Sequence, residues 1–202
     1  PEMAVYAGPE LSAATGVTAL ARAIEGLYSS DRNPLSTGLA VHAIRLLGRA
    51  LPRVIETPDD LAARADCQMA CLMSGTAAMN AMASVVHAIG HIVGGRYALQ
   101  HGTSHAILLG PAMRRLLPAI GADLAIVLEA LGADPRGSAS DAADRVEGLL
   151  AALPLRRRLR DVGVEEDALP EIAAATMDDY MMPNLPAPMT EADVLGLLEE
   201  GF

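Results

Sequence analysis

The sequence predicts an all-α fold, a helical bundle of about eight or nine helices. The chain of 202 residues is 51% hydrophobic but only 2% aromatic and has no Trp, so its core must be built from Ala, Leu, Val, Ile and Met, which favour helices. Apolar residues recur at helical spacing along most of the chain, and no alternating run typical of a strand is found. At this length, one helical domain over residues 1–202 is expected.

The N-terminal part begins with residues 1–11, which are expected to form an extended linker with a turn at Gly8-Pro9. Ser12 or Thr15 can cap a helix that runs to about residue 29. Asn33-Pro34 marks the cap and first turn of a second helix, which should end at Pro52. The longest helical run starts at residues 58–60 and reaches residue 91, or breaks once near residues 74–75. Because it is apolar on nearly every face, it is expected to be the central buried helix.

The C-terminal part is expected to hold several shorter helices. Gly94 and Gly95 should stop the preceding helix, so that a loop carries His101 before Ser104 caps the next one. Helices are then expected at residues 104–117, 122–131, 142–153, 155–162 and 165–177. Residues 183–189 form a Pro-rich irregular segment. Thr190, with Asp193, caps a last amphipathic helix.

Composition also excludes classes of partner. A net charge of -10 and a pI near 4.8 disfavour nucleic acid and anionic membranes, which need a basic face. No apolar run reaches the roughly 18 residues of a membrane span and no signal peptide is recognised, so a soluble cytoplasmic protein is expected. Cys67 and Cys71 are interpreted as small buried residues in a reducing compartment. Four methionines are interpreted as irregular core filler: Met69, Met73, Met79 and Met82. Four arginines are interpreted as an exposed helix face: Arg156, Arg157, Arg158 and Arg160.

Four of the five histidines lie within residues 85–109. His87 and His91 are four residues apart, so both rings project from one face of a helix. Together with His101 from the following loop, they could form a three-sided metal cage, because neutral imidazole is a common metal ligand. Ordinary core histidines are the alternative. Neither a G-x-G-x-x-G motif nor a P-loop is present, so nucleotide binding by those routes is excluded.

Several of these runs carry a family resemblance. AATGVTALARAIEGLY at residues 13–28, Asn33-Pro34 with its helix, VHAIGHIVGGRYALQHGTSHAILL at 86–109 and NLPAPMTEADVLGLL at 184–198 resemble the C-terminal domain of iron-containing (group III) alcohol dehydrogenases. The histidine run is most similar to the maleylacetate reductase branch. The resemblance covers nearly the whole chain. It implies a helical substrate and metal domain that normally follows an N-terminal dinucleotide-binding domain, which this chain is expected to lack.

The resemblance also implies a metal site, but this chain departs from it. The family places an Asp and a His four residues apart in the first helix, and these positions are Thr18 and Arg22 here. Only His87 and His101 remain as residual metal candidates, so no tightly bound metal is expected, although His105 could in principle substitute. Arg22 keeps a positive charge in the site, where it could hold a carboxylate or an oxyanion. The alternative is that Arg22 is simply exposed.

Three functions follow as hypotheses. In the first, the chain is the substrate domain of a reductase for a small, anionic carbonyl or keto-acid compound. His91, which matches a residue close to the nicotinamide, donates the proton, His87 and Arg22 orient the substrate, and Thr18 and His101 help to bind it. NAD(P)H is expected only if a dinucleotide-binding domain or subunit is supplied, and a homo-oligomer is expected. The second hypothesis is a standalone, metal-free isomerase, lyase, decarboxylase or cyclase that uses histidine acid/base chemistry. The third is a non-catalytic interaction module.

Overall fold

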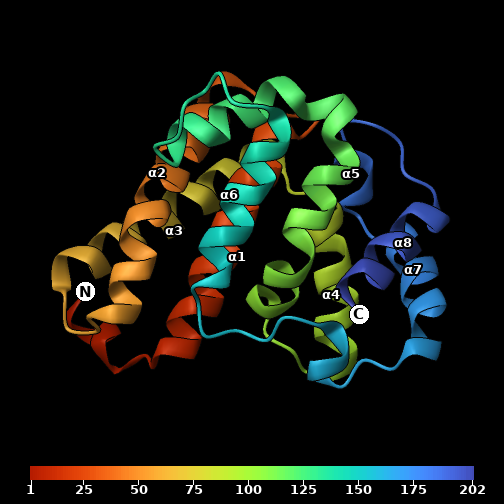
Figure 1. Cartoon of the computed structure of the whole chain (residues 1–202), viewed down its shortest axis with the longest axis horizontal. Coiled ribbons are helices and arrows are strands. Elements are labelled where there is room, and N and C mark those ends of the chain that lie inside the picture. Colours follow the sequence, from red (N-terminus) through yellow and green to blue (C-terminus); the bar gives the residue numbers. More distant parts are fainter.

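A computed structural model describes all residues, 1–202, and confirms the all-α prediction (Figure 1). It contains eight α-helices, four short 3-10 helices and no strand. The α-helices are α1 (Pro9–Tyr28), α2 (Pro34–Glu56), α3 (Leu61–Ala81), α4 (Val85–Tyr97), α5 (His101–Ala130), α6 (Ala139–Ala151), α7 (Leu169–Met177) and α8 (Glu191–Gly201). The 3-10 helices are η1 (Glu2–Tyr6), η2 (Leu159–Val162), η3 (Glu166–Ala168) and η4 (Met182–Asn184).

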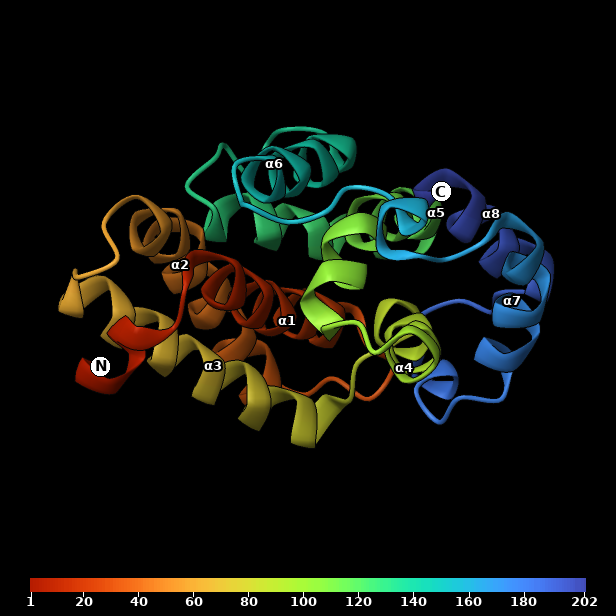
Figure 2. The ribbon, with the colours of Figure 1, turned by 90° about the horizontal axis from the view of Figure 1, so that it is seen from below.

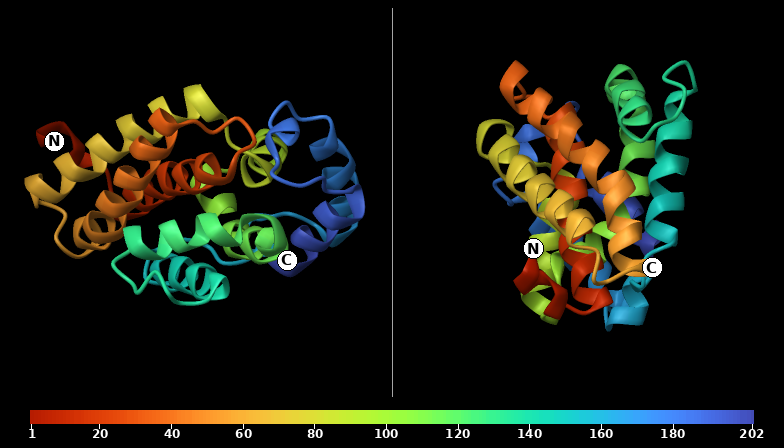
Figure 3. Two further views of the ribbon diagram at one scale, coloured as in Figure 1. Left: turned by 90° about the horizontal axis from the view of Figure 1, so that it is seen from above. Right: turned by 90° about the vertical axis from the view of Figure 1, so that its left-hand side faces the viewer.

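Helix α1 lies at the centre of the molecule. It packs against α2 and α3 on one side and against α4 and α5 on the other (Figure 2). Helix α6 covers α5, while α7 and α8 pair at the far end, next to α4 and α5 (Figure 3). One hydrophobic core of 50 buried residues runs through these layers. The site described below therefore rests on the most enclosed helix of the fold.

Polar caps fix several helix starts as the sequence predicts. Asn33 accepts hydrogen bonds from the backbone of α2, and Pro34 follows in the first turn. Thr190 forms a reciprocal capping box with Asp193 at the start of α8. Ser138 forms the same kind of box, so α6 begins at Ala139 and not at the expected residue 142. These local signals hold because they satisfy helix donors that have no partner within the helix.

The expectation for the N-terminal part is wrong in two places. Residues 1–11 are not an extended linker, because η1 forms there and α1 begins at Pro9, whose fixed φ suits a first helical position. Helix α2 does not end at Pro52 but continues to Glu56. The proline removes one backbone hydrogen bond, and the buried side chains of Leu51 and Val54 keep the helix on the core.

The helical run expected at residues 58–91 is not one central helix. It breaks once, as the alternative allowed, but the break lies at Met82, which adopts a positive φ of 57°, and not near residues 74–75. Helix α3 lies at the edge of the molecule, and two of the methionines expected as core filler are exposed, Met79 at 86% and Met69 at 47%. Met73 is half-buried and packs against the core. A run that is apolar on nearly every face does not specify which face is buried, so tertiary packing decides.

Around the histidines, the expected breaks move. Helix α4 continues through Gly94 and Gly95 to Tyr97, and Ala98 takes the left-handed cap conformation with φ 51°. His101 is the first residue of α5 and does not lie in a loop. Helix α5 joins the two helices expected at residues 104–117 and 122–131, because Pro111 and Pro118 do not break it.

The C-terminal expectations are met in part. Of residues 155–162, only η2 is helical, and residues 165–177 form η3 and α7. The first turn of the expected irregular segment belongs to η4. The four arginines near residue 158 are exposed, but they lie on a largely irregular segment and not on a helix face. No single helix is long and apolar enough to cross a bilayer, and α3 with α4 satisfies that test only jointly, across a bend of 107°.

Candidate active site

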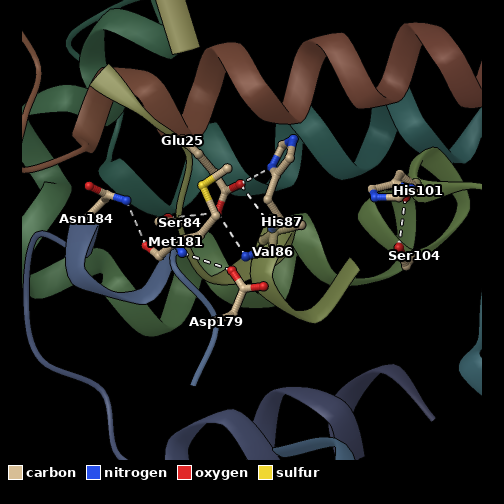
Figure 4. Close-up of polar contacts among 9 residues, drawn as sticks. All are labelled: Glu25, Ser84, Val86, His87, His101, Ser104, Asp179, Met181 and Asn184. Atoms are coloured by element: carbon tan, nitrogen blue, oxygen red, sulfur yellow. Dashed lines mark hydrogen bonds and ion pairs between the residues drawn. The ribbon is translucent and has the colours of Figure 1, made fainter. Parts of the chain in front are cut away.

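Glu25 of α1 caps the start of α4. Its side chain is 0% exposed, and its carboxylate accepts hydrogen bonds from Ser84 Oγ at 2.7 Å, from the Val86 amide at 2.9 Å and from the His87 amide at 3.3 Å (Figure 4). His87 Nδ1 also contacts this carboxylate. Ser84, the N-cap residue, makes no cap of its own with its side chain. A carboxylate from another helix therefore accepts from the first amides of α4 and interacts favourably with the positive, N-terminal end of the α4 dipole.

Two buried imidazoles meet behind this cap. The ring centroids of His87 and His105 are 4.2 Å apart. His87 Nε2 and both ring nitrogens of His105 are enclosed and have no hydrogen-bond partner. Burial, followed by the neighbouring His87, His101 and Arg22, holds the pKa of His105 well below its usual value. Gly90 permits this packing, because a Cβ there would lie 2.7 Å from His105 Nε2.

His91 is held in a different way, at the surface of the same helix. Its Nδ1 lies 2.9 Å from Asp179 Oδ2, and its ring stacks on Tyr180 with centroids 5.4 Å apart. On the other side, the ring of His101 lies 5.6 Å away, edge-on. The histidine is partly exposed, so its Nε2 is the nitrogen left for a ligand. An Asp that accepts from Nδ1 fixes the tautomer and orientation that a proton-transferring imidazole needs.

A hollow of about 450 Å³ lies next to these rings, between α1 and the start of α5. Its wall includes Thr18, Arg22 and His101, together with Gln100 and Gly102. The Arg22 guanidinium is partly buried and takes part in none of the ion pairs of the chain. The Thr18 hydroxyl donates to the Ala14 carbonyl at 3.0 Å, which leaves its oxygen to accept. The hollow thus offers an unpaired cation to a ligand.

The hollow does not fit a divalent metal ion. No group of three or more His, Cys, Asp or Glu side chains converges in a way that could hold one. Arg22 occupies the wall, and burial, followed by His91, His87 and the charge of Arg22, lowers the pKa of His101. A fixed guanidinium repels a metal cation as well as a proton, and two imidazoles alone are a weak ligand set.

The structure brings together most of the residues that the sequence singled out. Thr18, Arg22 and His101 line one hollow, and His91 stands beside His101. His87 does not reach the hollow, because its ring is buried between Glu25 and His105.

Sequence reasoning missed three partners in the site, Glu25, Asp179 and Tyr180. A signal for Glu25 exists in the sequence, because it shares the apolar helix face of Ala21 and Tyr28, where a carboxylate must find a partner.

The chain is similar to known proteins along nearly its whole length. Residues 12–202 match the model of the Fe-containing alcohol dehydrogenase family, C-terminal. The chain is 31% identical to long-chain-alcohol dehydrogenase 1 of Geobacillus thermodenitrificans, covering 100% of this chain and 53% of that protein. It is likewise 31% identical to a maleylacetate reductase of Sphingobium indicum, covering 98% of this chain and 54% of the relative. The crystal structure of a 1,3-propanediol oxidoreductase superposes with a TM-score of 0.92 at 32% identity, covering 98% of this chain and 53% of that one.

The all-α fold and the match over residues 12–202 thus define a helical domain of the kind found in the C-terminal part of Fe-containing alcohol dehydrogenases. The chain belongs to the Fe-containing alcohol dehydrogenase family and corresponds to its C-terminal part. It spans about half the length of the curated relatives that it matches.

Proposed function

We propose that this chain is the substrate domain of a reductase that acts on a small carbonyl compound bearing a carboxylate, without a metal ion. The observation that carries the proposal is the unpaired guanidinium of Arg22 in the wall of the hollow. A guanidinium binds a carboxylate or a developing oxyanion through two parallel hydrogen bonds, so it favours an anionic substrate. Arg22 would therefore orient the substrate and select its charge.

His91 is the proposed proton donor. Its Nδ1 is held by Asp179, which leaves Nε2 to deliver a proton to the carbonyl oxygen as that oxygen gains charge. The ring centroid of His101 lies 5.6 Å from that of His91, and His101 completes the polar side of the hollow. The contact between Glu25 and His87 anchors the start of α4 on the buried side. A nicotinamide, bound by a separate domain or subunit, would supply the hydride.

Substitution of Arg22 tests the charge selection. In the full-length protein supplied with NADH or NADPH, Arg22→Met should lower kcat/KM for a keto acid by about 100-fold, equivalent to about 2.7 kcal/mol. The same variant should leave kcat/KM for a neutral aldehyde of equal length within about threefold, and Arg22→Lys should fall between. As a control, Arg49→Met removes an arginine from the surface pair with Asp66 and should leave kcat/KM unchanged for both substrates. Equal losses for both substrates would refute the role of Arg22.

A non-redox enzyme is the second candidate, because the His91–Asp179 pair and Arg22 are sufficient for proton transfer on an anion. Exchange of the α-protons of a keto acid in D₂O, followed by NMR without any nicotinamide, separates the two. Exchange that requires His91 but no nicotinamide favours this candidate.

A further inference from the structure

A second hollow, of about 220 Å³, lies where η1, α1, α2 and α3 meet. Its wall is mostly apolar and includes Ala4, Val54 and the thiols Cys67 and Cys71, with the guanidinium of Arg64 as its one cation. In Figures 2 and 3 the N-terminal segment runs alongside α3 and closes this end of the molecule. The reductase proposal does not use this hollow.

Arg64 is unusual among the arginines. It is only 4% exposed, yet it takes part in none of the ion pairs of the chain. Its contacts are to neutral oxygens, with Nε donating to the Pro58 carbonyl at 2.5 Å and the two terminal nitrogens making long contacts of 3.4 Å to Ser12 Oγ and the Ala7 carbonyl. A buried charge without a counter-charge is costly, so an anion would find a strong partner here.

No acidic side chain of the chain serves as that partner. Asp66, two residues away, pairs with Arg49 at 3.0 Å. Asp60 pairs with Arg53 and also caps α3. The thiols do not supply a charge either, because burial raises the pKa of Cys67 to about 12 and also raises that of Cys71. The hollow therefore combines one uncompensated positive charge with a wall that is otherwise uncharged and mostly apolar.

We propose that this hollow binds a small aliphatic monocarboxylate, whose carboxylate pairs with Arg64 and whose chain lies against the apolar wall. One cation suits a monoanion better than a phosphate dianion, which needs more donors. The volume corresponds to roughly seven water-sized units, which matches a ligand of about six to eight heavy atoms such as butanoate or hexanoate. This site is separate from the reductase proposal, although Thr15 borders both hollows.

The test is ligand-detected NMR on the full chain at pH 7, with hexanoate as the probe and hexanol as its uncharged match. Hexanoate should bind with a dissociation constant of about 1 mM, and hexanol at least tenfold more weakly. Arg64→Met should weaken hexanoate at least tenfold, whereas Arg49→Met, which removes a nearby surface charge, should not. If Arg64→Met fails to fold, Cys67→Phe, which fills the hollow and leaves Arg64 in place, should abolish binding.

Three results would overturn the proposal. Equal binding of hexanol and hexanoate would show an apolar site without anion recognition. Binding retained in both Arg64→Met and Cys67→Phe would place the ligand elsewhere. Binding lost in Arg22→Met but kept in Arg64→Met would assign the carboxylate to the first hollow, which would support the reductase proposal and refute this one.

Discussion

Removal of the Glu25 carboxylate should destabilise the fold strongly. Glu25→Ala leaves the amides of Val86 and His87, the Ser84 hydroxyl and the His87 ring without an acceptor in an enclosed place. Each buried donor left unpaired costs about 1–3 kcal/mol, and this substitution removes the acceptor of all of these donors at once. We expect the free energy of unfolding to fall by about 4 kcal/mol, and Tm by about 12 °C at this chain length.

Glu25→Gln removes the negative charge of the side chain but keeps its size and shape, so it separates the two contributions. Glutamine still offers one carbonyl oxygen to the α4 amides, so a loss of about 2 kcal/mol is expected. The measurement is urea unfolding followed by circular dichroism, with the slope against urea checked for constancy. Asp66→Asn is the matched control, because its pair with Arg49 is exposed and should cost about 0.5 kcal/mol. If Glu25→Ala unfolds within 1 kcal/mol of the parent chain, the carboxylate does not cap α4 as described.

Three further predictions concern the site and its frame. Asp179→Asn should lower kcat about tenfold while KM stays within about twofold, because the substitution frees the orientation of His91; an unchanged kcat across pH 6–9 would contradict this. Gly102→Ala should cost about 3 kcal/mol in urea unfolding, since a Cβ there would lie 1.7 Å from the α1 backbone, whereas Gly95→Ala, with open space around it, should be neutral or stabilise by up to about 1 kcal/mol. The buried, neutral His105 has a folded pKa below its unfolded value of about 6.5. Its contribution to the free energy of unfolding is therefore complete above pH 6.5, and below that pH the free energy of unfolding declines by up to about 1.4 kcal/mol per pH unit. This decline should be smaller in His105→Gln, and an equal decline in both proteins would be inconsistent with a buried, neutral His105.

The fold class was predictable because it depends on amino-acid composition and on the spacing of apolar residues along the chain. A chain rich in Ala and Leu, and almost free of aromatic residues, favours helices wherever the apolar spacing allows. Caps such as Asn33 and Thr190 were predictable for the same local reason. The boundaries around Gly94 and Pro118 were not, since both residues weaken a helix by amounts that tertiary packing easily exceeds.

The candidate site was predictable only where its residues lie close in sequence. His87 and His91 share a helix face, and the family resemblance led to Thr18 and Arg22. Asp179 could not be found in this way, because it lies 88 residues from His91 and reaches it only through the packing of α7 on α4. The exposed stripe of α3 was missed for a related reason, since Met69 and Met79 have the composition of a core but no partner helix outside them.

Arg22 and Glu25 show how a single helix sets the chemistry that we propose. Glu25 is fully buried, and its carboxylate accepts hydrogen bonds from the start of α4. Its negative charge therefore stabilises that helix, and Glu25 does not line the hollow. Arg22, one turn earlier in α1, remains unpaired beside His101. Burial, the neighbouring His91 and His87, and Arg22 together lower the pKa of the His101 ring, which favours a neutral imidazole there. The net charge offered to a ligand is therefore positive and comes from a group that cannot lose its proton. Recognition of an anion at this place should accordingly persist from pH 6 to pH 9, whereas an imidazolium-based site would lose it above neutrality.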